Sequence, residues 1–224
     1  MHLSFKTILP AIGILCLGCK KILQIPAPIG NITTSQVFSS NTQAGYAVSG
    51  MYFNMINSGQ LSYANSGLTV FGGLSADEFI LFDQTNTNVE QFQQNKLLPT
   101  NNYINTQLWS STYSTIYIAN SIIQGLTNYS GVSDSISNEL TGEAEFIRAF
   151  CHFYLINLFG NVPIVTTIDW HKTNLLSRST SDAVYAQIVS DLLDAKARLA
   201  TDFSAGGGQR SQRLASLRDR RMLW

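Results

Sequence analysis

The sequence of 224 residues predicts a mostly α-helical protein built from antiparallel helix pairs. Two observations lead to this fold class. Three long segments repeat apolar residues every three to four positions, which is the spacing of one helix face. Helix start and stop signals flank two of these segments, with Gly160 and Pro163 after one and Ser179 and Asp182 at the beginning of another.

A first, weaker helix is expected over Asn41–Asn57, and an irregular region follows it. Its apolar residues recur at helical spacing: Ala44, Ala47, Val48, Met51, Tyr52 and Met55. Gly45 and Gly50 lower the helix propensity, so packing must hold this segment. From Ser58 to Asn102, glycine, asparagine and glutamine indicate loops, with short strands near residues 67–71 and 79–82. A loop region this long is usually functional.

The central helices are expected over Tyr103–Asn128 and Asn138–Phe159. One continuous face of the first contains Trp109, Tyr113, Ile116, Asn120 and Ile123. We expect Asn120 to bond backbone at a helix contact. In the second helix, one stripe contains Leu140, Ala144, Ile147, Cys151, Tyr154 and Leu158, and a second contains Phe146, Phe150 and Phe153. So wide an apolar surface predicts that the helix is buried on more than one side. A short extended segment is expected after it, over Val162–Thr166.

The last helix is expected over Ser181–Leu199. Ser179 and Asp182 have the spacing of a capping box, with Asp in place of Glu. The expected buried face consists of Tyr185, Ile188, Leu192, Ala195 and Leu199.

Composition excludes several classes of function. The chain has 14 basic and 14 acidic side chains, and only 12% of its residues are charged. Zero net charge argues against a general nucleic-acid binder. No apolar run reaches the roughly 18 residues of a membrane-spanning helix, which excludes a multi-pass membrane protein. The charge is unevenly distributed, because residues 209–224 contain five Arg and one Asp.

The amino terminus has the features of a targeting segment. A short region with one Lys precedes 11 residues, Thr7–Leu17, that are apolar except for Pro10. The sequence Leu-Cys-Leu-Gly-Cys that ends at Cys19 resembles the lipobox of bacterial lipoproteins. That resemblance implies a signal peptide over 1–18, a lipid on Cys19 and a tether over 19–40. The alternative is an ordinary secretory signal in which Cys19 is incidental.

Cysteine usage and catalytic motifs give little support for an enzyme. Once Cys16 is removed and Cys19 acylated, Cys151 has no disulfide partner within the chain. Nucleotide-binding, nucleophile-elbow and H-E-x-x-H zinc motifs are absent. Glu145, Arg148 and His152 share one helix face, but a structural polar cluster is favoured over a hydrolase site. We expect no enzyme activity, no cofactor and no metal.

Three segments resemble the SusD/RagB family of outer-membrane lipoproteins. Trp109, Tyr113, Ile116 and Asn120 are similar to its W-x3-Y-x2-I-x3-N helix. Residues 142–150 (GEAEFIRAF) and 158–163 (LFGNVP) resemble its G-E-A-x-F-x-R-A helix and L-F-G-x-V-P exit. Residues 184–192, which include Val-Tyr, Ile and Asp-Leu, resemble its third signature.

The resemblance implies an all-α fold of divergent tetratricopeptide-like helix pairs with long irregular loops. It also implies a non-enzymatic, surface-exposed protein, lipid-anchored in the outer membrane. Such a protein binds oligosaccharides and delivers them to a SusC-like TonB-dependent transporter. The alternative function is a helical-repeat interaction scaffold of the outer membrane that binds no small molecule.

The candidate ligand residues lie in the irregular region. Sugar sites combine flat aromatic faces with amide and carboxylate hydrogen bonds. Residues 77–109 contain that mixture, and the candidates are Asp77, Phe79, Asp83, Gln91 and Phe92. Trp109 also lies in this range, but on a helix face expected to be core. The family has no motif for its sugar contacts, so it assigns none of these residues.

The chain departs from the family near its end. Family members are substantially longer, so we expect an incomplete SusD-like domain over 41–204 and a frameshifted or non-native tail over 205–224. The last helix would then lack a packing partner, which leaves Tyr185, Ile188 and Leu192 partly bare. We therefore expect a truncated, inactive fragment of marginal stability.

Overall fold

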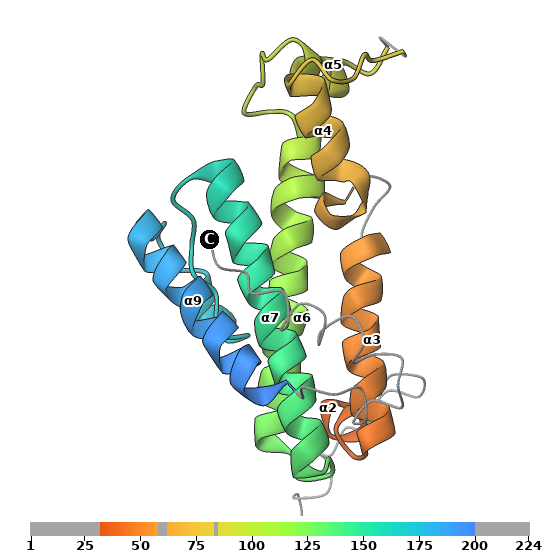
Figure 1. Ribbon diagram of the computed structural model, residues 1–224, viewed down its shortest axis with the longest axis vertical. Coiled ribbons are helices and arrows are strands. Elements are labelled where there is room, and N and C mark those ends of the chain that lie inside the picture. The colour runs from red at the N-terminus through yellow and green to blue at the C-terminus, as the bar shows by residue number, and fades with distance from the viewer. Residues whose placement is uncertain (1–31, 58–61, 83–84, 200–224) are drawn as a thin grey trace, which may run out of the picture. The chain divides into compact units, whose positions relative to one another are not determined.

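The computed structural model describes residues 32–57, 62–82 and 85–199. The chain divides after Thr33 into two units, and the larger one, from Thr34 onward, contains all the helices described below. Its described residues form helices and loops without a strand, which confirms the all-α class. Four long helices, α3, α6, α7 and α9, lie roughly side by side (Figure 1).

The larger unit begins with α2 (Thr34–Val37) and α3 (Asn41–Asn57), and the bounds of α3 are those expected. Ala44, Val48 and Met51 form the buried face of α3. Phe38, between the two helices, is also buried. The packed structure therefore starts before residue 41, and residues 34–40 belong to it, although they were expected in the tether.

The prediction of two short strands in the irregular region is wrong. The segment contains a π-helical turn, η2 (Tyr63–Gly67), followed by α4 (Leu68–Ser75) and, further on, α5 (Thr87–Gln93). Residues 79–82 form a loop. Short apolar runs do not distinguish strand from helix. Here no neighbouring strand is present to satisfy the backbone, whereas a helix satisfies its own backbone and places Phe71 and Leu74 in the core.

The helix expected over residues 103–128 is confirmed as two consecutive helical segments. A π-helical segment, η3 (Ile104–Ser110), leads directly into α6 (Ser111–Asn128). Ile116, Ala119 and Ile122 are buried, and α6 packs against both α3 and α7. Trp109, Tyr113 and Ile123 are only partly buried, so the true core face is rotated from the expected one.

The longest helix, α7 (Asp134–Phe159), begins four residues earlier than expected and ends where expected. Gly160 terminates it with a φ of 67°, a left-handed conformation that glycine adopts without strain. Leu140, Ala144, Ile147 and Cys151 are buried as expected.

The second buried side of α7 is not the one expected. Phe153 is 42% exposed, and Phe146 and Phe150 are only partly buried. The buried polar and charged residues on that second side include Glu145, Arg148 and His152. Neighbouring helices cover this polar side because it finds ionic and hydrogen-bond partners there.

The segment after α7 is extended over residues 162–166, as expected, and then forms the short helix α8 (Trp170–Thr173). A single antiparallel bridge joins Val162 to Ser179. The last helix, α9 (Ser181–Arg198), is confirmed, but its cap is Thr180, whose side chain accepts from the backbone N–H of Ala183. The expected capping box of Ser179 and Asp182 is therefore wrong. In such a box Asp182 would accept from the N–H of Ser179, but this N–H donates to the carbonyl of Val162 in the bridge.

Helix α9 packs antiparallel along α7 (Figure 1), and its buried face agrees with the expected one at Ile188, Ala195 and Leu199 but not at Tyr185 and Leu192. Its buried residues are Val184, Ile188, Asp191 and Ala195, followed by Leu199 just after the helix. At Gly142 of α7, an added Cβ would lie 3.0 Å from the Cβ of Arg198, so glycine permits this close approach. Tyr185, Val189 and Leu193 are 41%, 53% and 60% exposed, and form the bare stripe of α9.

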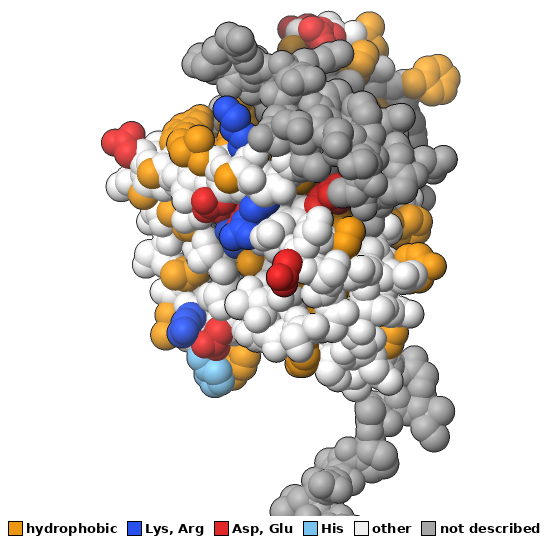
Figure 2. Space-filling view, turned by 60° about the horizontal axis from the view of Figure 1, so that its bottom comes forward, with side chains coloured by type: hydrophobic (Ala, Val, Ile, Leu, Met, Phe, Trp, Pro, Cys, Tyr) orange, Lys and Arg blue, Asp and Glu red, His pale blue; other side chains and the backbone are white. Residues whose placement is uncertain are grey.

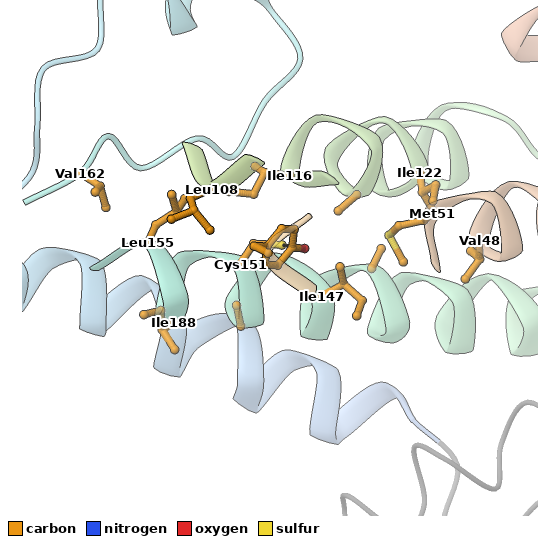
Figure 3. Packing of buried hydrophobic residues seen from close by; sticks show 14 of the residues in the cluster. Val48, Met51, Leu108, Ile116, Ile122, Ile147, Cys151, Leu155, Val162 and Ile188 are labelled. Atoms are coloured by element: carbon orange, nitrogen blue, oxygen red, sulfur yellow. Dashed lines mark hydrogen bonds between the residues drawn. The ribbon is translucent and has the colours of Figure 1, made fainter. Parts of the chain in front are cut away.

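The core lies between α3, α6 and α7, with Ile188 of α9 at its margin (Figure 3). Cys151 and Leu155 of α7 are fully buried there, near Ile116 of α6. The Tyr63 hydroxyl lies 3.0 Å from the Cys151 sulfur. Burial raises the pKa of the Cys151 thiol to about 12, so this cysteine remains a packed, unreactive thiol. None of the described helices is both long and apolar enough to cross a membrane.

Candidate functional site

Four of the five residues selected from the sequence, Asp77, Phe79, Gln91 and Phe92, lie where α4 and α5 meet, at one end of the larger unit (Figure 1). Side-chain hydrogen bonds tie the two loops of this end together. Gln93 accepts from the N–H of Leu81 at 2.8 Å, and Asn95 donates to the carbonyl of Ser75 at 3.0 Å. The Ser75 hydroxyl donates to the carbonyl of Phe92 at 3.1 Å. The backbone of this end is thus organised before any ligand binds.

Asp77 and Phe79 are at the exposed surface of this end. Asp77 has a φ of 60°, which turns the chain sharply after α4. The N–H groups of Glu78 and Phe79 both donate to the carbonyl of Gly73, at 2.8 and 3.1 Å. The Phe79 ring lies directly against Gly73, where any side chain would displace it. Phe79 is 43% exposed, so part of its ring remains available.

Gln91 and Phe92 occupy structural positions beneath this surface. The Gln91 side-chain oxygen accepts from the N–H of Leu98 at 3.1 Å and from the Asn101 amide at 3.0 Å. Phe92 is buried, and its ring stacks on Phe71 with centroids 4.4 Å apart. The Phe92 ring therefore presents no face to a ligand in this structure. Asp83 lies outside the described residues.

Sequence reasoning missed several residues of this end. Ile80, Leu97 and Leu98 are 85%, 45% and 54% exposed, and no periodic pattern marked them as surface. Asn101 is buried and caps the start of the following helical segment by accepting from the N–H of Tyr103. An asparagine just before a helical pattern is a recognised start signal, so Asn101 could have been found from the sequence.

A buried polar network joins α6, α7 and α9. The Arg148 guanidinium makes two bonds to the Asp191 carboxylate, at 2.8 and 2.7 Å, and a third to the side-chain oxygen of Asn120 at 2.8 Å. The Asn120 amide donates to the carbonyl of Val165 at 3.0 Å. The expected role of Asn120, bonding backbone at a helix contact, is confirmed.

His152 and Glu145 extend this network in separate directions. The Nε2 of His152 accepts from the N–H of Val165 at 3.3 Å, so Nδ1 carries the proton and donates to the carbonyl of Arg148 at 3.0 Å. Burial lowers the pKa of His152 to about 4. Burial also raises the pKa of Glu145, an effect opposed by the ion pair with Arg198 at 3.2 Å. The two side chains are each committed to different partners, as a structural cluster requires.

An aromatic contact links η3 to the end of α7. The Trp109 ring lies 4.9 Å from both the Tyr113 and the Phe159 rings, and the Arg178 guanidinium lies 5.4 Å from its centroid. The Tyr113 hydroxyl donates to the carbonyl of Pro163 at 2.9 Å. Trp109 therefore stabilises the junction between η3 and the end of α7. Within the described residues, no three His, Cys, Asp or Glu side chains are grouped to hold a metal.

These features define an all-α protein of packed helix pairs, with a polar network inside and an irregular, partly apolar end outside. The three sequence segments that resemble one family meet in this network and the adjoining aromatic contact. The chain belongs to the SusD-like family, described as starch-binding proteins that associate with the outer membrane, and residues 54–215 match it. The match extends past residue 205, where the sequence analysis placed the end of the family pattern.

Individual relatives agree with this assignment. The chain is 27% identical over 201 residues to SusD-like protein P25 and 25% identical over 183 residues to SusD-like protein P2, both of Formosa agariphila. These alignments cover 83% and 80% of this chain but 36% and 35% of the relatives. The chain thus spans about a third of the length of the curated relatives it matches.

Solved structures share the fold. A SusD-like protein of Bacteroides fragilis matches 87% of this chain and 37% of its own, with a TM-score of 0.63 and 20% identity. A laminarin-binding SusD-like protein matches 72% of this chain and 34% of its own, with a TM-score of 0.61 and 23% identity. The fold class expected from the sequence is confirmed by these likenesses.

Proposed function

We propose that the protein is a non-enzymatic, cell-surface lipoprotein that binds oligosaccharides and delivers them to a SusC-like TonB-dependent transporter. The family match over residues 54–215 is the observation that carries this proposal. The ligand surface proposed is the α4–α5 end, where Asp77 and Phe79 are the contacts.

The chemistry of this end suits a sugar. The half-exposed Phe79 ring offers an apolar face to the C–H groups of a pyranose, and the exposed Asp77 carboxylate, two residues earlier in the chain, can accept hydrogen bonds from hydroxyls. Gln91 and Phe92 act indirectly: Gln91 holds the loop of Leu98, and Phe92 supports α4 from below. Asp83, which lies outside the described residues, stays a further candidate from the sequence.

A glycan array tests the ligand, using the chain without its first 18 residues. Asp77→Ala and Phe79→Ala should each weaken binding by at least about tenfold, a loss of about 1.4 kcal/mol. Asp182→Ala, which removes an exposed carboxylate on α9, is the matched control and should bind as the wild type does. Equal binding by all four proteins would reject the α4–α5 end as the ligand surface.

The proposed anchor is Cys19, which lies outside the described residues. Two acyl chains give the two membrane signals that stable anchoring requires. Metabolic labelling with a fatty-acid probe should mark the wild-type protein in the outer-membrane fraction and leave Cys19→Ala unlabelled. Equal labelling of both would remove the anchor from the proposal.

The bare stripe of α9 favours the second candidate function, an interaction scaffold. Val189 and Leu193 present apolar side chains to solvent, as a protein-binding helix does. A scaffold would give no sugar signal on the array and would still bind the transporter. Co-purification with the transporter, combined with the array, distinguishes the two functions.

The truncation of the chain also stays a proposal. Residues 200–224 lie outside the described residues, and the tail is rich in arginine. An incomplete SusD-like chain would lack part of the surface that longer relatives have, and would be inactive in uptake. Sequencing the genomic DNA beyond codon 224 in all frames tests this, because a SusD-like continuation is expected in one of them.

A further inference from the structure

The loop between α7 and α9 is fixed at its base to the interior. The N–H of Ser179 donates to the carbonyl of Val162 at 3.0 Å and closes the loop. Val165 is bonded through its carbonyl to Asn120 and through its N–H to His152. These bonds connect the loop to the buried network, so its base cannot shift without disturbing α6 and α7.

The part of the loop farther along the chain holds α8 in a defined conformation. The Asp169 side chain accepts from the N–H of His171 at 3.1 Å and caps the helix. The Asp169 carbonyl accepts from the N–H groups of Lys172 and Thr173, both at 3.0 Å. The N–H of Asp169 donates to the Thr167 hydroxyl at 3.2 Å. The backbone around Trp170, the first residue of α8, is therefore well organised.

Trp170 presents a large aromatic surface to solvent. Its side chain is 63% exposed, and one side of the ring is backed by the His171 imidazole, with centroids 3.8 Å apart and planes inclined by 33°. Tryptophan normally buries most of its area, as Trp109 does beneath Phe159 and Arg178. The loop thus holds the Trp170 indole in solvent. His171 covers one side of the ring, and the other side is open to a ligand.

Charged groups beside the indole can make hydrogen bonds. The Lys172 ammonium lies 3.7 Å from the Asp169 carboxylate, and the two side chains are 74% and 39% exposed. Figure 2 shows a surface histidine with a basic and an acidic side chain beside it. The pair supplies both donors and acceptors while its charges cancel, which suits a neutral ligand better than an anion.

We propose that Trp170 is a stacking platform for a neutral pyranose ring, with Asp169 and Lys172 bonding its hydroxyls. An apolar plane bordered by polar groups matches the two kinds of surface that a pyranose presents. This second glycan contact is separate from the α4–α5 end and rests on the proposed function, since it assumes a carbohydrate ligand. It is contained within residues 162–179, so the 224-residue chain includes all of it.

Native affinity electrophoresis of the chain without its first 18 residues, in gels containing laminarin or soluble starch, tests this proposal. At least one polysaccharide should retard the wild-type protein, and Trp170→Ala should bind at least about tenfold more weakly. Leu175→Ala is the matched control, because Leu175 is an 80% exposed apolar residue of the same loop outside the platform. It should be retarded as the wild type is. Acrylamide quenching of tryptophan fluorescence should decrease with the sugar in the wild type.

Three outcomes would overturn the inference. Equal retardation of Trp170→Ala and the wild type would remove the platform and leave the proposed function intact. Equal weakening by Trp170→Ala and Leu175→Ala would indicate a general apolar contact, as a protein-docking loop would have. If neither polysaccharide retards the wild-type protein, the platform and a glycan-binding role for this chain both fail.

Discussion

Replacing Arg148 by Met should destabilise the folded protein more than any other single change in the polar network. Met keeps most of the aliphatic volume but removes the guanidinium. Asp191, whose side chain is 2% exposed, would then hold a buried charge without its cation, and Asn120 would lose a donor. Breaking a buried pair in this way costs about 3–5 kcal/mol. That is a large share of the roughly 5–15 kcal/mol by which domains are stable.

Urea unfolding followed by circular dichroism measures this cost. Asp191→Leu combined with Arg148→Met removes both charges, so the double variant should be more stable than Arg148→Met alone. Lys172→Met is the matched control, because its ion pair with Asp169 is exposed and should contribute only about 0–1 kcal/mol.

Two results would refute this reasoning. The first is a loss below about 1 kcal/mol for Arg148→Met, close to that of an exposed pair. The second is a double variant as unstable as the sum of the two single variants. Either result would mean that Arg148 and Asp191 are solvated in solution and do not hold α7 to α9.

Three further predictions concern pH, packing and capping. The pKa of His152 is lowered to about 4 from an ordinary 6.5, so the unfolded chain binds this proton more tightly than the folded one. In urea titrations at each pH, the free energy of unfolding should be greatest above pH 6.5 and should fall by about 3 kcal/mol toward pH 4. His152→Gln should flatten this slope, and an unchanged slope would assign it to other groups. Gly142→Ala should lower the free energy of unfolding by about 1–3 kcal/mol, since the new Cβ would meet Arg198 and Leu199 at 3.0 and 3.1 Å. Gly50→Ala, with nothing within 4 Å, should raise it by about 0.5–1 kcal/mol in the same assay. A rise at both sites would contradict the close approach of α9. Thr180→Ala should lower the free energy of unfolding by about 1 kcal/mol, because it removes the side chain that caps α9. An equal loss for Ser179→Ala would indicate that Ser179 is the capping residue.

Local sequence patterns were sufficient to predict the four long helices. The bounds of α3 and the start of α9 agree with the expected ones, and Gly160 ends α7 as expected. Helix periodicity and stop signals act within a few residues of one another, so they can be read without knowing the neighbours. The family resemblance singled out further residues, and the structure shows what three of them do: Arg148 of α7 bonds both Asn120 of α6 and Asp191 of α9.

The sequence by itself predicted the buried faces of α6, α7 and α9 only in part. On α9, Tyr185 is exposed while Val184 and Asp191 are buried, because Arg148 lies on the neighbouring helix to receive the carboxylate. On α7, the polar side is buried for the same reason. Apolar residues on both sides of a helix make its periodicity ambiguous, and only the position of a partner resolves it.

For the candidate site as well, the sequence indicated the region and the tertiary structure decided which side chains are exposed. Composition selected the region after α3 that is rich in Asn and Gln, but could not separate exposed Phe79 from buried Phe92. Phe92 is covered because Phe71, 21 positions earlier in the chain, stacks on it. Trp170 is exposed although the base of its loop is bonded to the interior at Val165. Whether an aromatic side chain can meet a ligand depends on contacts between distant segments, and only the tertiary structure determines those contacts.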